Sequence, residues 1–227
     1  VVVGESTFLF TIGGFKIITD PWFGEAIYGG GWTQYPSPKI NLRQLSGITH
    51  IFISHVHPDH CCIESIKKIL NYSPSVKLII MDRGDVCHLS KKLSRSFTSD
   101  LDSWVVKIKP YDEYKLDCFS LWCLPPSSEN SLNEVLDSSL LLRCPEGLIL
   151  FSNDNLPTLE HASFINNLHL PQYIALIPFS GGSGYPSSYE NISFEEKLKI
   201  ASRIRVNYEK IAVDFLATTS FDYFMPV

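Results

Sequence analysis

The sequence predicts an α/β protein in which β-sheets are packed inside layers of helices. The pair Gly13-Gly14 separates apolar segments at 8–12 and 15–19, which predicts a tight β-hairpin at the start. Beyond the hairpin, short β-branched segments alternate with segments whose apolar residues recur at helical spacing. This alternation is typical of sheets that are covered by helices.

The remaining elements follow in the order of the chain. Apolar and β-branched segments predict strands at 48–54, 77–81, 119–124, 139–143, 148–151 and 173–177. Ile63, Ile66 and Ile69 recur at helical spacing and predict a helix. Further helices are predicted near 159–168 and 194–208. No repeat or linker divides the sequence, so we expect one domain over 1–227. The sequence begins with Val in place of Met, which suggests a trimmed sequence.

Composition excludes several classes of protein. With 227 residues, of which 44% are hydrophobic, the chain can bury a sizeable core. A net charge of −5 without a basic run argues against nucleic acid or an anionic membrane as a partner. No apolar stretch approaches the ~20 residues that a membrane span needs, and we see no signal peptide. The 6 cysteines form no CxxC pair, which predicts free thiols in a reducing, cytoplasmic compartment.

The most informative segment is HVHPDH, which directly follows one of the predicted strands. Alternate residues of an extended segment project to the same side, so His55 and His57 can reach one cation. Pro58 ends this extension, and Asp59 and His60 can then serve a second, adjacent cation. Imidazole and carboxylate ligands suit zinc, iron or manganese. The sequence therefore predicts a metal site at the end of this strand.

HxHxDH after an apolar strand resembles the signature of the metallo-β-lactamase superfamily. This resemblance implies a four-layer αββα sandwich with the site at one edge of its two sheets. Asp20 matches the early strand-terminal Asp that supports the metal ligands, and Asp154 matches the carboxylate that usually bridges the two ions. Taken alone, Asp20 could be a turn residue and Asp154 a helix cap. The resemblance makes Asp59 and Asp20 the candidate catalytic residues.

Two positions depart from the pattern of hydrolases in this superfamily. Hydrolases normally carry a His between the cluster and the bridging Asp, whereas residues 124–130 are LPPSSEN. Glu129 is the best substitute metal ligand, and Glu134 and Asp137 are weaker candidates. A solvated loop residue is an equal alternative for Glu129. Hydrolases often place a final metal-binding His after the strand predicted at 173–177, where this chain has PFSGGSGYP.

These departures resemble one branch of the superfamily. TDPWF, followed by Gly31-Trp32 and Pro36, and the later GGSGYP are similar to the catalytic domain of hydroxylases of CMP-sialic acid and UDP-muramic-type sugars. A related diiron hydroxylase branch also uses Glu where hydrolases use His. The resemblance implies two metal ions, with iron preferred because carboxylates favour harder cations, and zinc as the alternative. It also implies a small polar substrate and, without a Rieske domain in the sequence, a separate electron-donor protein.

The segment GGSGYP is a candidate for substrate binding. It lacks the Lys and Ser or Thr of a Walker sequence, but glycines let backbone N–H groups approach and hold an anion. In this fold the segment borders the metals, which gives the candidate substrate-binding residues Gly181, Gly182, Ser183, Gly184, Tyr185 and also Trp32. Trp22 and Tyr35 are further candidates for aromatic walls of the pocket. An ordinary loop, or core packing of the aromatic residues, is the alternative reading.

Three functions remain open from the sequence alone. The departures favour an O2-dependent iron hydroxylase, and the general habit of the superfamily favours a hydrolase of an ester, lactone, amide or phosphodiester. The third is a degenerate member that keeps the fold as a binding module. The intact HxHxDH cluster disfavours the third, and the hydroxylase is narrowly preferred.

Overall fold

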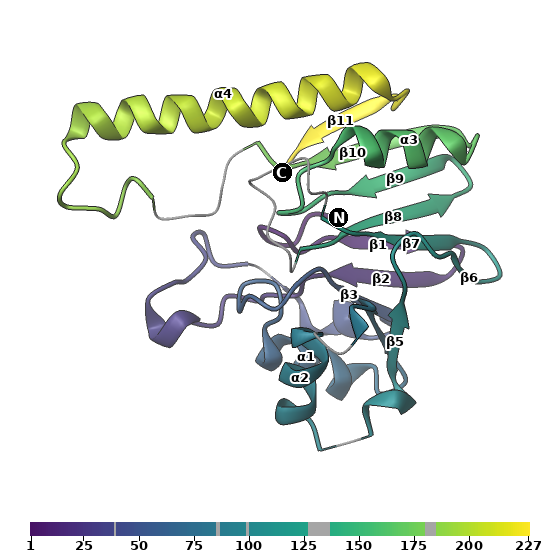
Figure 1. The fold of residues 1–227 in the computed structure, drawn as a ribbon. Helices are drawn as coiled ribbons and strands as arrows, with labels where there is room; N and C mark the ends of the chain where they lie inside the picture. The colour runs from purple at the N-terminus through teal and green to yellow at the C-terminus, as the bar shows by residue number, and fades with distance from the viewer. Residues whose placement is uncertain (39, 85–86, 99, 127–136, 180–184) are drawn as a thin grey trace.

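Two β-sheets lie face to face between two layers of helices (Figure 1). The structure is a computed structural model that describes residues 1–227 except 39, 85–86, 99, 127–136 and 180–184. Helices α1 (Ile63–Tyr72) and α2 (His88–Ser96) cover the outer face of the first sheet. Helices α3 (Leu159–Asn167) and α4 (Phe194–Thr218) cover the outer face of the second. The predicted four-layer αββα sandwich is therefore confirmed.

The first sheet contains the amino-terminal strands in the order β1-β2-β3-β4-β5. Its strands are β1 (Leu9–Ile12), β2 (Phe15–Thr19), β3 (His50–Ile53), β4 (Lys77–Met81) and β5 (Val105–Ile108). Strands β1 and β2 are antiparallel, and β2 to β5 run parallel to one another. Gly13 and Gly14 join β1 to β2 with φ values of +53° and +88°. Glycine adopts this left-handed region without steric cost, which explains the tight hairpin.

The second sheet has the order β11-β10-β9-β8-β7-β6. Its strands are β6 (Tyr114–Lys115), β7 (Ser120–Leu124), β8 (Ser139–Cys144), β9 (Gly147–Phe151), β10 (Gln172–Ile177) and β11 (Tyr223–Pro226). Strands β9, β10 and β11 are parallel, and the other neighbours are antiparallel. Gly147 begins β9 with φ +139°, and a Cβ atom there would lie 2.6 Å from the Pro171 carbonyl oxygen. The close approach of these two backbone segments therefore requires glycine.

Three apolar cores fill the three spaces between the layers. In β3, Ile51 and Ile53 face α1 and α2, whereas Phe52 faces the other sheet. This alternation follows from the two-residue period of a strand. The central core joins Phe52 to Phe151 of β9, and the outer core of the second sheet joins β9 and β10 to α3 and α4. Strands that are apolar on both faces are thus explained by burial on both sides.

Helix α4 extends well past the sheet that it covers (Figure 1). It begins with a capping box, in which Ser193 and Glu196 bond to each other's backbone N–H groups. Only Ala212 and Phe215, in its second half, are buried. The helix was predicted to end near 208 and continues to Thr218. Across the described ranges, no helix is both long and apolar enough to cross a lipid bilayer.

The fold brings several strand ends to the same edge. Strands β2 and β3 are parallel neighbours, so Asp20 and Ser54, which follow them directly, lie close together. In the second sheet, β9 ends at Phe151 and is followed by Asn153 and Asp154. The edge at which these strands end carries the candidate site.

All six cysteines are free, and Cys118 alone among them is exposed.

Candidate metal centre

The HVHPDH segment forms a compact turn between β3 and α1. The backbone N–H groups of His60 and Cys61 both donate to the carbonyl oxygen of His57, at 3.1 and 2.7 Å. This turn brings the His60 ring back beside His55, with the ring centroids 4.1 Å apart. Both rings are almost completely buried, at 1% exposure for His55 and 3% for His60. Two histidines therefore face the same small space.

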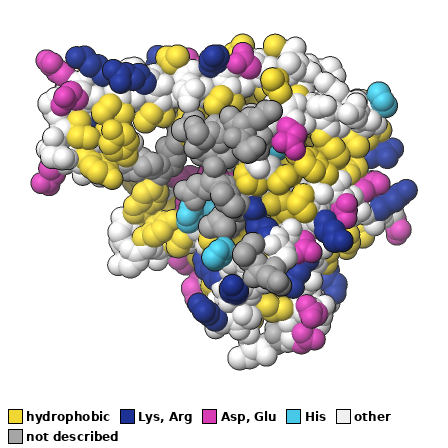
Figure 2. Space-filling model, in the orientation of Figure 1, with side chains coloured by type: hydrophobic (Ala, Val, Ile, Leu, Met, Phe, Trp, Pro, Cys, Tyr) yellow, Lys and Arg dark blue, Asp and Glu magenta, His cyan; other side chains and the backbone are white. Residues whose placement is uncertain are grey.

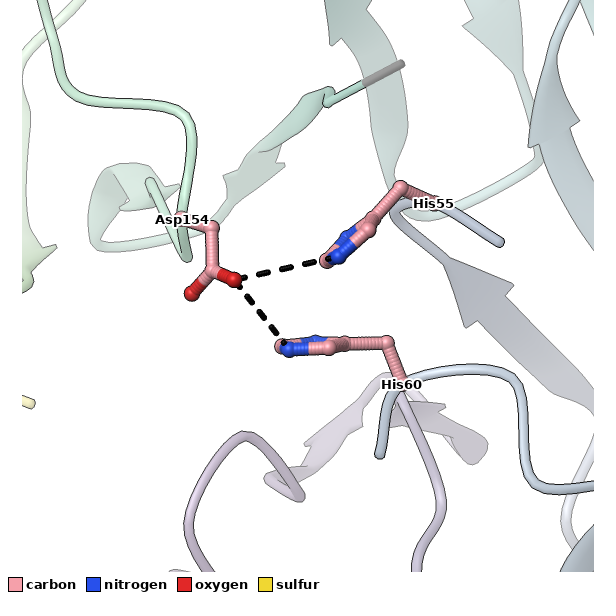
Figure 3. A group of neighbouring side chains, drawn as sticks. All are labelled: His55, His60 and Asp154. Atoms are coloured by element: carbon pink, nitrogen blue, oxygen red, sulfur yellow. Dashed lines mark ion pairs between the residues drawn. The ribbon is translucent and has the colours of Figure 1, made fainter. Parts of the chain in front are cut away.

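Asp154 closes this space from the opposite sheet. One carboxylate oxygen, Oδ2, lies 3.7 Å from His55 Nε2 and 3.3 Å from His60 Nε2 (Figure 3). Ligand atoms of all three residues lie within 4.8 Å of one another. The predicted convergence of Asp154 with the histidine cluster is therefore present in the structure.

His57 and Asp59 flank this group on its two sides. His57 Nδ1 lies 2.8 Å from His55 Nε2, and Asp59 Oδ2 lies 3.4 Å from His60 Nε2. Both side chains are partly exposed, unlike the two buried histidines. The structure thus places His57 beside His55 and Asp59 beside His60, and both buried histidines approach the same oxygen of Asp154. Two neighbouring pairs of ligands beside one carboxylate support the prediction of two ions.

Asp20 lies beneath the histidines and is completely buried. Its Oδ1 accepts from Ser54 N–H at 2.8 Å, and its Oδ2 accepts from Ser54 Oγ at 2.7 Å. Its Oδ2 also lies 3.1 Å from His60 Nδ1 and accepts from Asn153 Nδ2 at 2.7 Å. The predicted contact between Asp20 and the cluster is present, and it turns His60 Nε2 toward Asp154.

Asp137 supports the other histidine. Its Oδ1 lies 3.9 Å from His55 Nδ1, and Ser54 Oγ lies 2.9 Å from the same nitrogen. Asp137, a weaker candidate ligand in the sequence, thus contacts His55 on the side that faces away from Asp154. Metal-binding histidines usually bond through their second nitrogen to a carboxylate or similar group, which fixes the ring orientation. Both His55 and His60 have such a partner.

The electrostatics of this site suit a cation. Burial, reinforced by the nearby His60, lowers the pKa of His55 to about 2, so this ring is neutral as metal binding requires. Burial also opposes a charge on His60, but the carboxylates of Asp154, Asp20 and Asp59 outweigh it and raise the His60 pKa well above its ordinary value. A proton on His60 in the metal-free protein offsets the charge of these carboxylates. A metal ion would take over that role.

The donor set fits the metals that the sequence predicts. Imidazole nitrogen and carboxylate oxygen are the ligands of zinc and of non-haem iron. Two histidine Nε2 atoms and one Asp oxygen already converge without rearrangement of the backbone. Metal binding by His55, His57, Asp59, His60 and Asp154 stays a prediction that this geometry supports.

A pocket of about 250 Å³ opens beside the metal centre. Its lining includes Trp32 and Phe179 together with the acidic and histidine side chains Glu5, Asp59, His60 and Asp154. Trp32, a predicted substrate-binding residue, therefore lies at the pocket. Figure 2 shows histidine side chains at the surface in the middle of one face, with hydrophobic side chains nearby.

The other predicted pocket residues have different places. Glu129, Glu134, Gly181, Gly182, Ser183 and Gly184 lie outside the described residues. Tyr185 is exposed and packs edge-on against Tyr189, with 5.1 Å between centroids. Trp22 is 2% exposed and packs in a small core with Ile27 and Cys62, so core packing, the alternative to a pocket wall, holds for this residue. Tyr35 is 98% exposed and is absent from the residues that line the pocket.

Three residues at the site had no signal that singled them out in the sequence. Glu5 lines the pocket from the segment before β1. Thr7 anchors this segment, because its Oγ1 donates to the Asp20 carbonyl oxygen at 2.8 Å. Asn153 contacts Asp20. Tyr28 donates from its hydroxyl to Asp59 Oδ1 at 3.0 Å. Glu5 and Tyr28 come from segments distant in sequence, so only the fold brings them to the cluster.

The family assignment agrees with this geometry. Residues 2–114 match the family model described as "Beta-lactamase superfamily domain". This match, which includes the HxHxDH cluster and the first sheet, shows that residues 2–114 belong to the metallo-β-lactamase superfamily, and the αββα architecture of the whole chain agrees with it.

Two curated relatives match shorter segments of the chain. N-acyl-phosphatidylethanolamine-hydrolyzing phospholipase D 1 from Caenorhabditis elegans is 31% identical over 81 residues, which is 34% of this chain and 23% of that protein. Cytidine monophosphate-N-acetylneuraminic acid hydroxylase from Sus scrofa is 33% identical over 70 residues, 30% of this chain and 16% of that protein. The matched segments therefore cover less than a quarter of either relative.

A solved structure shares the fold over most of the chain. CmlA, a diiron beta-hydroxylase from Streptomyces venezuelae, superposes with a TM-score of 0.58 and 17% sequence identity. The superposition covers 92% of this chain and 42% of that one. These three similar proteins thus comprise two that are named as hydroxylases and one that is named as a hydrolysing phospholipase.

Proposed function

We propose that the chain holds two metal ions and serves as the catalytic domain of an O2-dependent iron hydroxylase. The proposed substrate is small and polar, such as a sugar nucleotide. The observation that carries the proposal is the convergence of His55 Nε2, His60 Nε2 and Asp154 at one edge of the sandwich. A separate protein would donate the two electrons that accompany insertion of one oxygen atom from O2.

The ligand composition supports iron over zinc. The chain has 7 histidines, and in the described part of the chain the histidines grouped with Asp154 are His55 and His60. His50 packs among aromatic rings of the central core, His161 Nε2 contacts the Pro125 carbonyl oxygen at 2.8 Å, and His88 and His169 begin or follow helices. The imidazoles that hydrolases use beyond the cluster are therefore missing. Carboxylates in their place would favour a harder cation.

The similarity to hydroxylases supports an O2-dependent hydroxylation as the reaction. A relative named as a hydroxylase of a cytidine monophosphate-linked sugar is 33% identical to this chain over 70 residues. The fold that the chain shares with a diiron hydroxylase covers 92% of its length. Two irons supply O2 activation when they are bound in such a centre.

Each side chain then has a defined task. Asp154 would contact both ions, and Asp20 keeps the Nε2 atom of His60 aimed at Asp154. Trp32 and Phe179, which line the pocket, would exclude water from one side of a bound substrate. The polar lining residues Glu5 and Asn153 would hydrogen-bond to the polar groups of the substrate.

Metal analysis and oxygen uptake test this proposal together. The protein would be purified without added metal, analysed for iron and zinc, and then loaded anaerobically with Fe2+. We expect two irons per chain and O2 consumption when a chemical reductant and a panel of sugar nucleotides are supplied. Mass spectrometry should show a product heavier by one oxygen atom, labelled by 18O2. Two tightly held zinc ions without O2 consumption would contradict the hydroxylase.

One observation favours a hydrolase as the second candidate. The phospholipase from Caenorhabditis elegans is 31% identical to this chain over 81 residues. A bound metal can lower the pKa of a coordinated water to ~7 and thereby provide a nucleophile. Protein loaded with Zn2+ instead of Fe2+ would be assayed with ester, lactone, amide and phosphodiester substrates. Hydrolysis that disappears in the His60→Ala variant would establish this second activity.

A further inference from the structure

The segment Ile27–Trp32 forms a strained loop beside the metal centre. Ile27 and Trp32 pair with each other through backbone hydrogen bonds of 3.0 and 3.3 Å, which close the loop. Between them Tyr28, Gly29 and Gly30 have φ values of +50°, +68° and +93°. Glycine tolerates this region, but a tyrosine there has an unfavourable contact between its Cβ and the backbone. Strain of this kind is held by the surrounding structure and gathers at functional sites.

The loop is anchored to the body of the protein on both sides. Ile27 is buried against Trp22 and Cys62. Trp22 Nε1 donates to the Glu25 carbonyl oxygen at 2.7 Å, and the Glu25 carboxylate accepts from Ser65 of α1 at 2.9 Å. The rings of Tyr28 and Trp32 pack edge-on, with 5.6 Å between their centroids. The Tyr28 hydroxyl is therefore fixed relative to α1 and to the turn that precedes it.

The two carboxylate oxygens of Asp59 have different neighbours, and one of these is the Tyr28 hydroxyl. This hydroxyl donates to Asp59 Oδ1 at 3.0 Å. The other oxygen, Oδ2, lies 3.4 Å from His60 Nε2, on the side of the proposed metal centre. A hydrogen bond to the first oxygen fixes the rotation of the carboxylate and so keeps the second oxygen directed at the ion. The contact joins residues 31 positions apart, and the backbone of Tyr28 is left-handed, with φ +50°.

We propose that Tyr28 is a positioning residue that holds Asp59 as a one-oxygen ligand of the ion bound by Asp59 and His60. This inference rests on the two-ion centre of the proposed function and adds a residue outside the HxHxDH cluster. Without the phenol, Asp59 can rotate and use either oxygen or both. The ion on this side would then be held more weakly and with a changed coordination number.

Removal of the hydroxyl alone tests this role. Tyr28→Phe keeps the ring against Trp32, so a role in packing would leave metal binding unchanged. Tyr35→Phe is the matched control, because Tyr35 lies seven positions further along and is 98% exposed. Zn2+ titration of each metal-free protein by calorimetry gives the affinity for each of the two ions. Residues that orient a metal ligand typically change metal affinity ~10–100-fold.

We expect Tyr28→Phe to lower the affinity for one of the two ions ~10–100-fold. The affinity for the other ion and the fold should stay unchanged, and so should both affinities in the Tyr35→Phe control. Co2+ substitution identifies the ion concerned, because its visible bands report coordination number. The band that changes in Tyr28→Phe should be the one that is lost in Asp59→Ala. Unchanged thermal unfolding of metal-free Tyr28→Phe shows that the variant folds.

Three results would overturn the inference in different ways. Wild-type affinity for both ions and an unchanged Co2+ spectrum in Tyr28→Phe contradict the role of Tyr28 and leave the proposed function intact. A wild-type protein that binds fewer than two ions contradicts the proposed function and the inference with it. A charge-transfer band of iron and phenolate in the wild type, lost in Tyr28→Phe, would make Tyr28 a metal ligand and also overturn the positioning role.

Discussion

Asp20 Oδ2 lies 3.1 Å from His60 Nδ1, although 40 residues separate the two in the sequence. Asp20 follows β2 and His60 follows the turn after β3, so the parallel pairing of these strands produces the contact. With Nδ1 engaged, the remaining nitrogen of His60 points at Asp154, 3.3 Å away. The orientation of this histidine is therefore determined by a carboxylate that lies beneath the centre.

The Asp20→Asn variant tests this relationship. Asp20 accepts hydrogen bonds from Ser54, Asn153 and His60, and an amide would direct N–H groups at one or more of these donors. We expect the variant to fold and to keep most of its metal, with affinity or activity lowered ~10–100-fold. Asp112→Asn, at an exposed position, is the control. Equal metal affinity and activity in both variants would contradict the proposed role.

The predicted metal ligands His57 and Asp59 can be replaced without disturbing an apolar core. His57 and Asp59 are partly exposed, and neither belongs to an apolar core. We therefore expect His57→Ala and Asp59→Ala each to lose at least one of two ions, measured by mass spectrometry of bound metals after dialysis. Circular dichroism of both variants should match the wild type. His88→Ala, at an exposed helix position, should retain both ions; wild-type metal content in His57→Ala and Asp59→Ala would refute the assignment.

Glu129 is the predicted replacement for the missing third histidine, and it lies outside the described residues. The described residues on either side approach the centre: Asn155 Nδ2 donates to the Leu124 carbonyl oxygen at 3.1 Å, and Ser138 Oγ donates to the Ser54 carbonyl oxygen at 2.6 Å. We expect Glu129→Gln to lower iron occupancy and Glu129→His to shift the preference toward zinc. Competition between Fe2+ and Zn2+ measures both effects.

The control for these substitutions is Glu113→Gln, at an exposed position between β5 and β6. This variant should bind both metals as the wild type does. An unchanged ratio of iron to zinc in Glu129→Gln and Glu129→His would exclude Glu129 as a ligand. It would also remove much of the support for iron, because the carboxylate-rich ligand set depends on this residue.

His50 predicts a loss of stability in acid that is separate from the metal centre. Burial, with Lys77 nearby, lowers the pKa of His50 to about 4. An unfolded histidine takes up a proton near pH ~6.5, so protons favour the unfolded chain between these values. The stabilising contribution is complete above pH ~6.5 and is lost as the pH falls toward the folded pKa. Urea unfolding of metal-free protein at several pH values measures this loss.

Replacement of His50 isolates its share of that pH dependence. His50 contacts the rings of Phe15, Tyr114 and Phe119, so Phe can occupy the same space. We expect the stability of His50→Phe to depend less on pH between ~4 and ~6.5 than that of the wild type. His88→Gln, at an exposed position, should follow the wild type. Parallel curves for wild type and His50→Phe would show that the buried histidine does not cause the loss.

Much of the fold could be predicted because its strands are apolar and its hairpin has a pair of glycines. The boundaries predicted at 15–19 and 77–81 agree with β2 and β4. Helix α2 was missed because only Leu89 and Leu93 of its nine residues are buried, which is too few for a visible period. Strands β5, β6 and β11 were missed because short, partly polar segments become strands only through their neighbours.

The site was predictable where it is local in sequence. The cluster at 55–60 could be identified because four potential ligands fall within six residues. Tyr28 and Glu5 could not, because each reaches the site through the fold and neither lies in a pattern with its partners. Pocket wall and core packing both stayed open for Trp22 because a sequence does not tell whether an aromatic ring after a turn faces a pocket or the core, and the structure places the ring in a core.

The distribution of thiols makes the protein suitable for selective labelling. Cys61 directly follows His60, and burial raises its pKa to about 11, so it stays protonated and unreactive. Cys118 is exposed and lies against the hairpin turn at Gly13, at the amino end of β2, whereas the metal centre lies at the carboxyl end. A maleimide dye would therefore attach at the edge of the sandwich remote from the candidate metal centre. Its emission would report events at that centre from a distance, without altering the residues that are predicted to bind the ions.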